Sequence, residues 1–70
     1  MDKHLFALRL RELRRRSLLT QGELAAQVGV NWRVVQRWEH GRAMPRASNL
    51  RRLCEVFGLA PRDLIEDGTE

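Results

Sequence analysis

The sequence has few of the residues that crosslink a chain or carry it across a membrane. Cys54 is the only cysteine, so neither an intramolecular disulfide nor a cysteine metal cluster can form, which fits a reducing cytoplasm. No apolar run approaches the ~18 residues that span a bilayer. The N-terminal segment MDKHLFALRLREL also lacks the continuous apolar stretch of a signal peptide. We therefore expect a soluble cytoplasmic protein with no membrane partner.

The chain also lacks the residue groupings of a metal site or a catalytic centre. His4 and His40 are far apart in the sequence and have no supporting ligands nearby. No Ser/His/Asp, Cys/His or paired-carboxylate arrangement suggests catalysis. We expect no enzymatic activity, no cofactor, no metal and no small-molecule ligand.

Composition and charge favour a small folded domain with an anionic partner. Seventy residues, of which 43% are hydrophobic and 31% charged, predict one globular domain over residues 1–70. A net charge of +4 is consistent with nucleic acid or with an anionic membrane surface. Every basic residue except Lys3 is arginine, which suits bidentate recognition of phosphate and guanine. A GC-rich genome would produce the same arginine excess, so this feature does not decide between functions.

Apolar spacing predicts five short helices and no strand. The helices are expected from Lys3 to Arg16, from Gln21 to a stop at Gly29, from Trp32 to Glu39 or His40, over residues 47–57 and over residues 61–67. The side chains expected to face the core are Leu5, Phe6, Leu10, Leu13, Leu24, Ala25, Val28, Leu50, Leu53, Cys54, Phe57, Leu64 and Ile65.

Start and stop signals are clearest in residues 20–41, TQGELAAQVGVNWRVVQRWEHG. Thr20 followed by Glu23 is a capping-box pattern, which predicts that the second helix begins at Gln21. Gly29 can take the left-handed conformation of a sharp helix stop, and Asn31 is a candidate N-cap for the third helix. The segment therefore predicts two helices joined by a tight turn.

The third helix has two chemically different faces. On a helical wheel the apolar residues Val34, Val35 and Trp38 share one arc. The other arc carries donor-rich side chains and no acid, namely Trp32, Arg33, Gln36 and Arg37. Arginine can donate two hydrogen bonds to guanine and glutamine can pair with adenine in the major groove. The alternative is that Arg33 and Arg37 are solvated surface charges.

Together these residues resemble the phage repressor/Cro type of helix-turn-helix domain, the xenobiotic-response-element family of regulators. The resemblance covers roughly residues 5 to 66. The residues that carry it are Leu10, Leu13 and Arg14, the segment LTQGELAAQVGV over residues 19–30, and then Trp38, Glu39, Gly41, Pro45, Leu50, Leu53, Phe57 and Gly58.

This resemblance implies an all-α, compact five-helix lambda-repressor-like domain whose helix-turn-helix spans about residues 20–40. It implies binding to double-stranded DNA, usually as a homodimer, by a cytoplasmic, nucleoid-associated protein of bacterial or phage origin. The positions that match base contacts are Asn31, Trp32, Arg33 and Arg37, with Gln36 beside them. The positions that match phosphate contacts are Gln21, the backbone amides around His40 and Gly41, and the side chains of Arg42 and Arg46. Arg14 and Glu39 match a structural ion pair.

Several positions depart from the family pattern. Leu18 stands where glycine is common, which predicts a strained connector. Trp32 replaces a smaller polar residue and could contact DNA or fold back onto the second helix. Gly22 lowers helix propensity, and either lets a phosphate approach or is neutral. Arg46 replaces a capping serine or threonine, and Cys54 replaces alanine as a buried thiol.

The leading hypothesis is a transcriptional repressor that occupies a near-palindromic operator. An antitoxin that autoregulates its operon is a second hypothesis, and a protein-interaction module that uses the same helix is a third. Dimerisation would draw on Leu59, Leu64 and Ile65, which the core could also require. The acidic C-terminal end is expected to point away from DNA, and its residues are Asp63, Glu66, Asp67 and Glu70.

Overall fold

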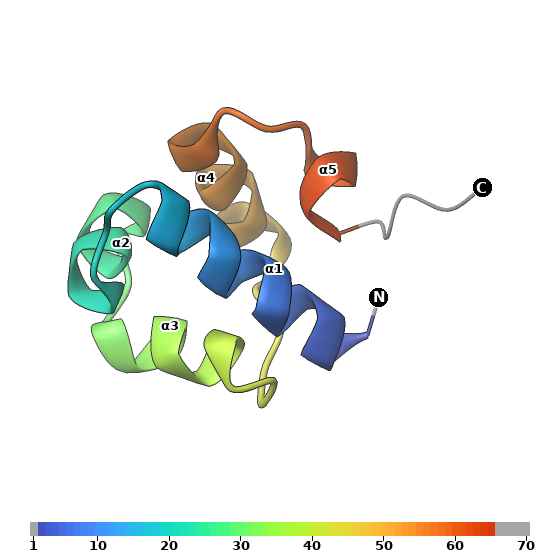
Figure 1. The fold of residues 1–70 in the computed structure, drawn as a ribbon, viewed down its shortest axis with the longest axis horizontal. Helices are drawn as coiled ribbons and strands as arrows, with labels where there is room; N and C mark the ends of the chain where they lie inside the picture. The colour runs from blue at the N-terminus through green and yellow to red at the C-terminus, as the bar shows by residue number, and fades with distance from the viewer. Residues whose placement is uncertain (1, 66–70) are drawn as a thin grey trace.

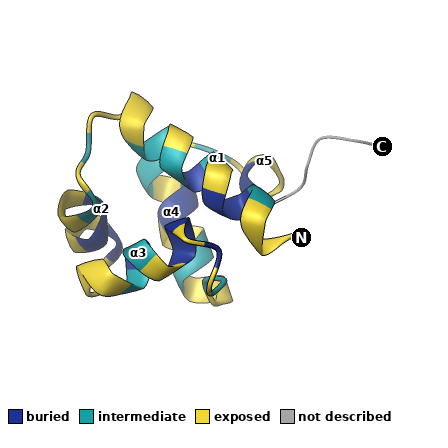
Figure 2. Ribbon diagram, turned by 60° about the horizontal axis from the view of Figure 1, so that its bottom comes forward, coloured by how far each residue is buried: buried dark blue, intermediate teal, exposed yellow. Residues whose placement is uncertain are grey.

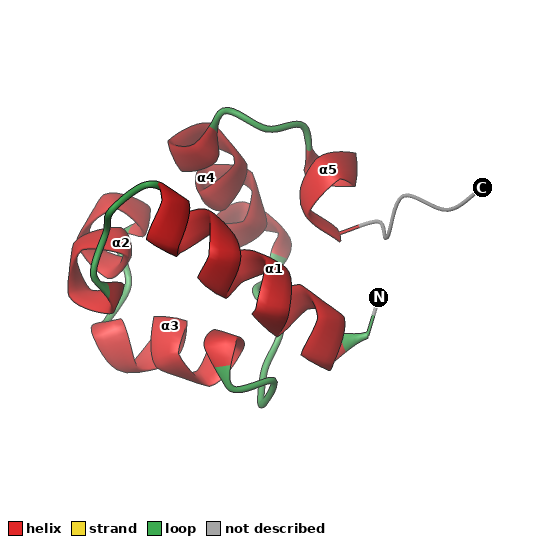
Figure 3. Ribbon diagram, in the orientation of Figure 1, coloured by secondary structure: helices red, strands yellow, loops and turns green. Residues whose placement is uncertain are grey.

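The computed structural model describes residues 2–65, and all of their regular structure is helical (Figures 1 and 3). The helices are α1 (Lys3–Arg16), α2 (Gln21–Val28), α3 (Trp32–Glu39), α4 (Ala47–Phe57) and α5 (Pro61–Ile65). The predicted all-α, five-helix class is confirmed, as are the expected bounds of the first four helices. The expected end of the fifth helix at Asp67 lies outside the described residues.

Side chains cap the first three helices, and the caps at Thr20 and Asn31 are those that the sequence predicts. The Thr20 hydroxyl accepts a hydrogen bond from the Glu23 N–H at 3.0 Å, and the Glu23 carboxylate accepts one from the Thr20 N–H at 2.8 Å. Asn31 Oδ1 accepts from the Arg33 N–H at 2.9 Å. Asp2 caps α1 in the same way, whereas Arg46 makes no side-chain cap bond at the start of α4. The poorer capping expected at Arg46 is confirmed.

A residue in the left-handed conformation follows each of the helices α1 to α4. Three are glycines, Gly29, Gly41 and Gly58, with φ values of 88°, 70° and 67°. The fourth is Leu18, with φ 57°, and it is the one non-glycine residue of this kind in the described part of the chain. The Leu18 N–H donates to the Arg15 carbonyl and the next N–H to the Arg14 carbonyl, which together form a Schellman motif. The strained connector predicted at Leu18 is therefore confirmed.

The core lies between all five helices, and among the residues whose burial is described Glu39 is its one charged or polar member. α3 packs against α1 and α2, while α4 packs against α2 and α5. The buried cluster consists of Phe6, Leu10, Leu24, Ala25, Val28, Val35, Trp38, Leu53, Cys54 and Leu64. Leu5 is only half-buried, and Leu13, Leu50 and Phe57 pack against this cluster while partly exposed. Ile65 lies in α5, but its side chain is not among the described ones.

No helix in the described part of the chain is both long and apolar enough to span a bilayer. The acidic residue Asp63 is exposed on α5, while Glu66, Asp67 and Glu70 lie outside the described residues.

Candidate nucleic-acid interface

α3 is fixed to the domain by one face. Val35 and Trp38 are buried in the core, and Val34 packs against it while partly exposed. Glu39, at the end of the helix, is 1% exposed. Figure 2 shows the start of α3 coloured as exposed and its end as buried. The apolar arc predicted from the helical wheel is therefore the arc that packs.

The opposite face of α3 carries the predicted base-contacting residues. Arg33 and Arg37 are exposed, and Trp32 is 45% exposed. Gln36 is half-buried between them. Asn31 is exposed at the N-cap, where its Oδ1 is occupied by the Arg33 N–H, so its amide nitrogen remains to donate. Because the one acid of α3 is the buried Glu39, this face is cationic.

Trp32 and Arg33 interact with each other. The guanidinium carbon of Arg33 lies 5.8 Å from the centroid of the Trp32 ring, within the range of a cation–π contact. With 45% of Trp32 exposed, the ring is available to an outside partner rather than folded fully onto α2. A cation–π contact uses none of the guanidinium N–H groups as hydrogen-bond donors, so Arg33 can still donate them to a partner.

The buried Glu39 carboxylate joins three helices. Arg14 of α1 donates to it through Nε at 2.6 Å and Nη2 at 3.0 Å, and Gln21 of α2 donates through Nε2 at 3.1 Å. Arg14 also donates to the Leu19 carbonyl at 2.9 Å. The hydrogen bond that Arg14 donates to Glu39 raises the pKa of Arg14, against the opposing effect of desolvation by burial. The ion pair predicted between Arg14 and Glu39 is confirmed.

The sequence did not indicate that Gln21 and Arg11 belong to this network. Gln21 is predicted to contact a phosphate. One hydrogen of its side-chain amide is donated to Glu39, and the second remains available to donate. Arg11 Nη2 donates to the Glu39 carbonyl at 2.7 Å. The end of α3 is thus held by α1 and α2 through both its side chain and its backbone.

The turn after α3 uses its backbone amides internally. The N–H groups of His40, Gly41 and Arg42 donate to the carbonyls of Gln36, Trp38 and Arg37 respectively. The sequence predicted that backbone amides around His40 and Gly41 would donate to a phosphate, but these three amides already donate to carbonyls of α3. Gly41 is also buried, whereas the side chains of His40 and Arg42 are exposed. Among the groups of His40, Gly41 and Arg42, the exposed side chains of His40 and Arg42 are therefore the ones open to an outside partner.

Two open grooves flank this turn, and both are lined with cations. The α4-side groove, of about 390 Å³, brings Arg37 and Arg46 together with Asn49. Its floor is apolar and consists of Val34, Trp38, Ala43, Met44 and Pro45. The α1-side groove, of about 520 Å³, is lined by His4, Ala7, Leu8, Arg11, Glu39, His40 and Arg42. Sequence reasoning did not single out His4, Arg11 or Asn49 as partners of the turn, because they reach it only through the fold.

The histidine, cysteine and acidic side chains of the described residues do not cluster as metal ligands would. Among residues 2–65, no three His, Cys, Asp or Glu side chains are grouped to hold a metal ion. Cys54 is buried as predicted, and desolvation, with smaller effects from Asp63 and Glu55, raises the pKa of its thiol. A raised thiol pKa lowers the fraction of reactive thiolate at neutral pH.

The sequence and the fold were compared with known protein families and solved structures. The family profile of the helix-turn-helix domain matches residues 5–67. The SOS-response transcriptional repressor LexA from Eubacterium rectale is 32% identical with a TM-score of 0.90, over 97% of this chain and 72% of that one. The restriction-modification controller protein C.AhdI from Aeromonas hydrophila is 33% identical with a TM-score of 0.85, over 91% of this chain and 97% of that one.

The DNA-binding domain of the P22 C2 repressor is 26% identical with a TM-score of 0.85, over all of this chain and 92% of that one. No protein of curated function matched the sequence. The profile match covers nearly the whole chain, and two of these solved structures exceed 30% identity over most of both chains. The chain therefore belongs to the helix-turn-helix domain family, with α2 and α3 as its helix-turn-helix and the Cro/C1-type repressor fold around them.

Proposed function

We propose that this protein is a sequence-specific transcriptional repressor that inserts α3 into the major groove of operator DNA. The observation that carries the proposal is the division of α3 between a buried anchoring face and an exposed cationic face. Val35, Trp38 and Glu39 hold the helix, while Arg33 and Arg37 face outward with no acid beside them. A helix held in this way presents its donors to base edges at low conformational cost.

Base reading is assigned to the exposed face of α3. Arg33 and Arg37 would each donate two hydrogen bonds to guanine, and Gln36 would pair with adenine. Asn31 would donate through the amide nitrogen that its capping role leaves free. Trp32 would hold the Arg33 guanidinium through their cation–π contact, and the exposed part of its ring would lie against a base methyl group.

Backbone contacts position the domain without reading sequence. Gln21 would donate its second amide hydrogen to one phosphate at the start of α2. On the other side of α3, His40, Arg42 and Arg46 would contact phosphates from the turn and the start of α4. These contacts bracket α3, which is the arrangement that fixes a helix in register along the groove.

Repression would follow from occupancy of an operator near a promoter, which excludes polymerase. The proposed form on DNA is a homodimer on a near-palindromic site in the cytoplasm, because the symmetry of an operator mirrors that of the protein. The activity is binding alone, without a cofactor or a catalytic step. The P22 C2 repressor domain and LexA, both named as repressors, support this direction of regulation.

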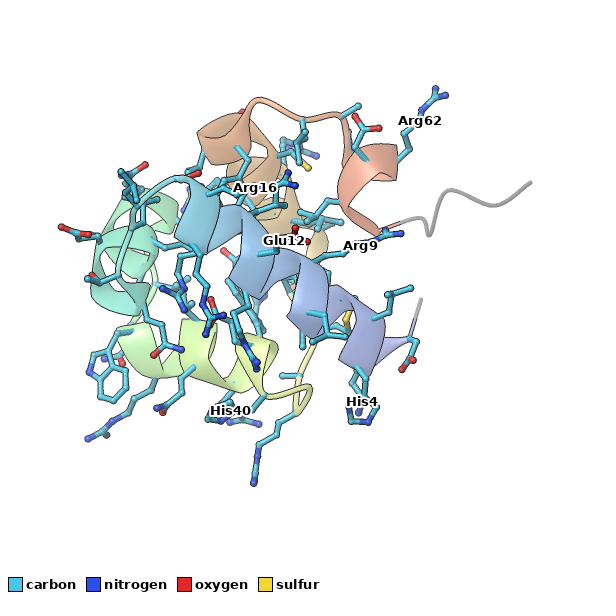
Figure 4. All side chains as sticks on the ribbon, viewed as in Figure 1. His4, Arg9, Glu12, Arg16, His40 and Arg62 are labelled. Atoms are coloured by element: carbon cyan, nitrogen blue, oxygen red, sulfur yellow. The ribbon has the colours of Figure 1, made fainter. Side chains whose placement is uncertain are left out.

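Arg33→Ala tests the proposal at its centre. On a duplex selected by the protein from random DNA, we expect affinity to fall by about 1–3 kcal/mol, or roughly 5- to 150-fold. Binding to unrelated duplex should change little, because that binding depends on phosphates. Arg62→Ala is the matched control, because it removes the same charge from the exposed side of α5 (Figure 4). Equal losses on selected and unrelated DNA would exclude a base-reading role for Arg33.

A further inference from the structure

The α1-side groove lies partly outside the helix-turn-helix, and the proposed function so far uses only half of it. His40 and Arg42 enter the groove from the turn after α3, while His4 and Arg11 enter it from α1. Figure 4 shows His4 and His40 at the same edge of the molecule, below α1. Four nitrogen-bearing side chains from two distant segments therefore meet in one open groove.

The groove has more positive than available negative charge around it, so its complementary ligand is an anion. The one acid among its lining residues is Glu39, whose carboxylate is 1% exposed and already bound by Arg14 and Gln21. The neighbouring acid, Asp2, uses its carboxylate to cap α1 by accepting the His4 N–H at 3.0 Å. Lys3, exposed beside His4, adds a further positive charge.

The His4 and Arg11 side chains are held in position by contacts that do not use all of their hydrogen-bond donors. A Cβ on Gly41 would approach His4 Nδ1 to 2.8 Å, so the imidazole lies directly against the turn where glycine leaves room. Arg11 uses Nη2 to hold the Glu39 carbonyl, which fixes its guanidinium while its other N–H groups remain. Little side-chain ordering is then required when an anion enters.

We propose that the α1-side groove binds a further backbone phosphate of the same DNA duplex, with His4 and Arg11 as its donors from α1. The inference rests on the proposed function and extends the footprint from the helix-turn-helix onto the first helix. His40 and Arg42 belong to the turn that would contact the DNA backbone, and they also line this groove. A DNA strand bound at the turn would therefore continue into the groove. Because a protonated imidazole carries a positive charge and a neutral one does not, a phosphate contact through His4 predicts that DNA affinity rises at lower pH.

The test measures how DNA affinity depends on salt at two pH values. A short labelled duplex of arbitrary sequence suffices, because phosphate contacts do not read bases. Each phosphate contact contributes about 0.9 to the slope of log K against log salt concentration. For the wild-type protein we expect a steeper slope at about pH 5.5 than at about pH 8, and an affinity gain of roughly three- to tenfold per added contact at moderate salt.

Three variants locate the contact, and two more serve as controls. His4→Gln should lose the part of the low-pH gain in DNA affinity that comes from α1. His40→Gln should lose the part that comes from the turn after α3. Arg11→Gln should lower the slope by about 0.9 at both pH values. The controls are Arg62→Gln, which removes a charge from the far side of the molecule (Figure 4), and Lys3→Gln, which removes the charge next to His4 in the sequence. Neither control should alter the pH dependence.

The outcomes separate the two proposals. Failure of the wild-type protein to bind any duplex, even at low salt and low pH, overturns the proposed function together with this inference. If the wild-type protein binds but His4→Gln keeps its full pH-dependent gain, the phosphate site is wrong and the proposed function stands. The His4 side chain is exposed, so this variant tests the site even where Arg11→Gln lowers stability.

Discussion

Replacing Leu18 with glycine should stabilise this protein, although the change removes a large side chain. Leu18 has φ 57° and occupies the position that glycine fills after α2, α3 and α4. A residue with a Cβ pays about 1–2 kcal/mol for this left-handed conformation, and glycine does not. Its side chain is 88% exposed, so almost no packing is lost. The two hydrogen bonds of the Schellman motif are formed by backbone atoms and remain.

The expected gain is smaller than the relieved strain. Glycine gives the unfolded chain about 0.4–1 kcal/mol of additional conformational freedom, which offsets part of the benefit. The free energy of unfolding should therefore rise by about 0.5–1 kcal/mol. For a domain of this size that corresponds to an increase in Tm of roughly 2–8 °C.

Urea unfolding followed by far-UV circular dichroism measures this gain, with a higher midpoint and an unchanged slope as the expected result. Leu18→Ala is the matched control, because it removes the side chain but keeps the Cβ. That control should change the free energy of unfolding by less than about 0.5 kcal/mol. If Leu18→Gly were no more stable than Leu18→Ala, the left-handed conformation of Leu18 would not cost the free energy assigned to it.

Two further predictions concern buried polar groups. Arg14→Ala should lower the free energy of unfolding by about 3 kcal/mol in urea, because Glu39 would keep a buried charge without its main partner. A loss under about 1 kcal/mol would show that water replaces Arg14. Burial raises the pKa of Cys54, so the folded state disfavours the thiolate and stability should fall as pH rises above the ordinary thiol range. Cys54→Ala should lack this decline in an alkaline unfolding series, and a parallel decline in both proteins would assign it to other groups.

Local signals in the sequence account for most of the fold. Thr20 with Glu23, Gly29 and Asn31 are each recognisable within a few residues, and their capping and stop geometry appears as predicted. Helical spacing also separated the packed face of α3, around Val35 and Trp38, from its exposed one. These features depend on neighbours along the chain, which a single sequence contains.

Contacts between distant segments were harder to predict. The family resemblance supplied the pair between Arg14 and Glu39, but nothing local placed Gln21 on the same carboxylate or Arg11 on the Glu39 carbonyl. The position of His4 against Gly41 depends on how α1 crosses the turn after α3. Side-chain direction and helix crossing decide such contacts, and the spacing of residues in the sequence does not determine either one.

The central claim is that the exposed face of α3 reads bases, and binding-site selection from random duplex DNA tests it most directly. The selected duplex and a scrambled duplex of equal length should then be titrated with the wild-type protein at one stated salt concentration. A specific reader should bind the selected duplex roughly 10³-fold or more tightly than the scrambled one. Recovery of no common sequence, together with equal affinity for the two duplexes, would contradict the account.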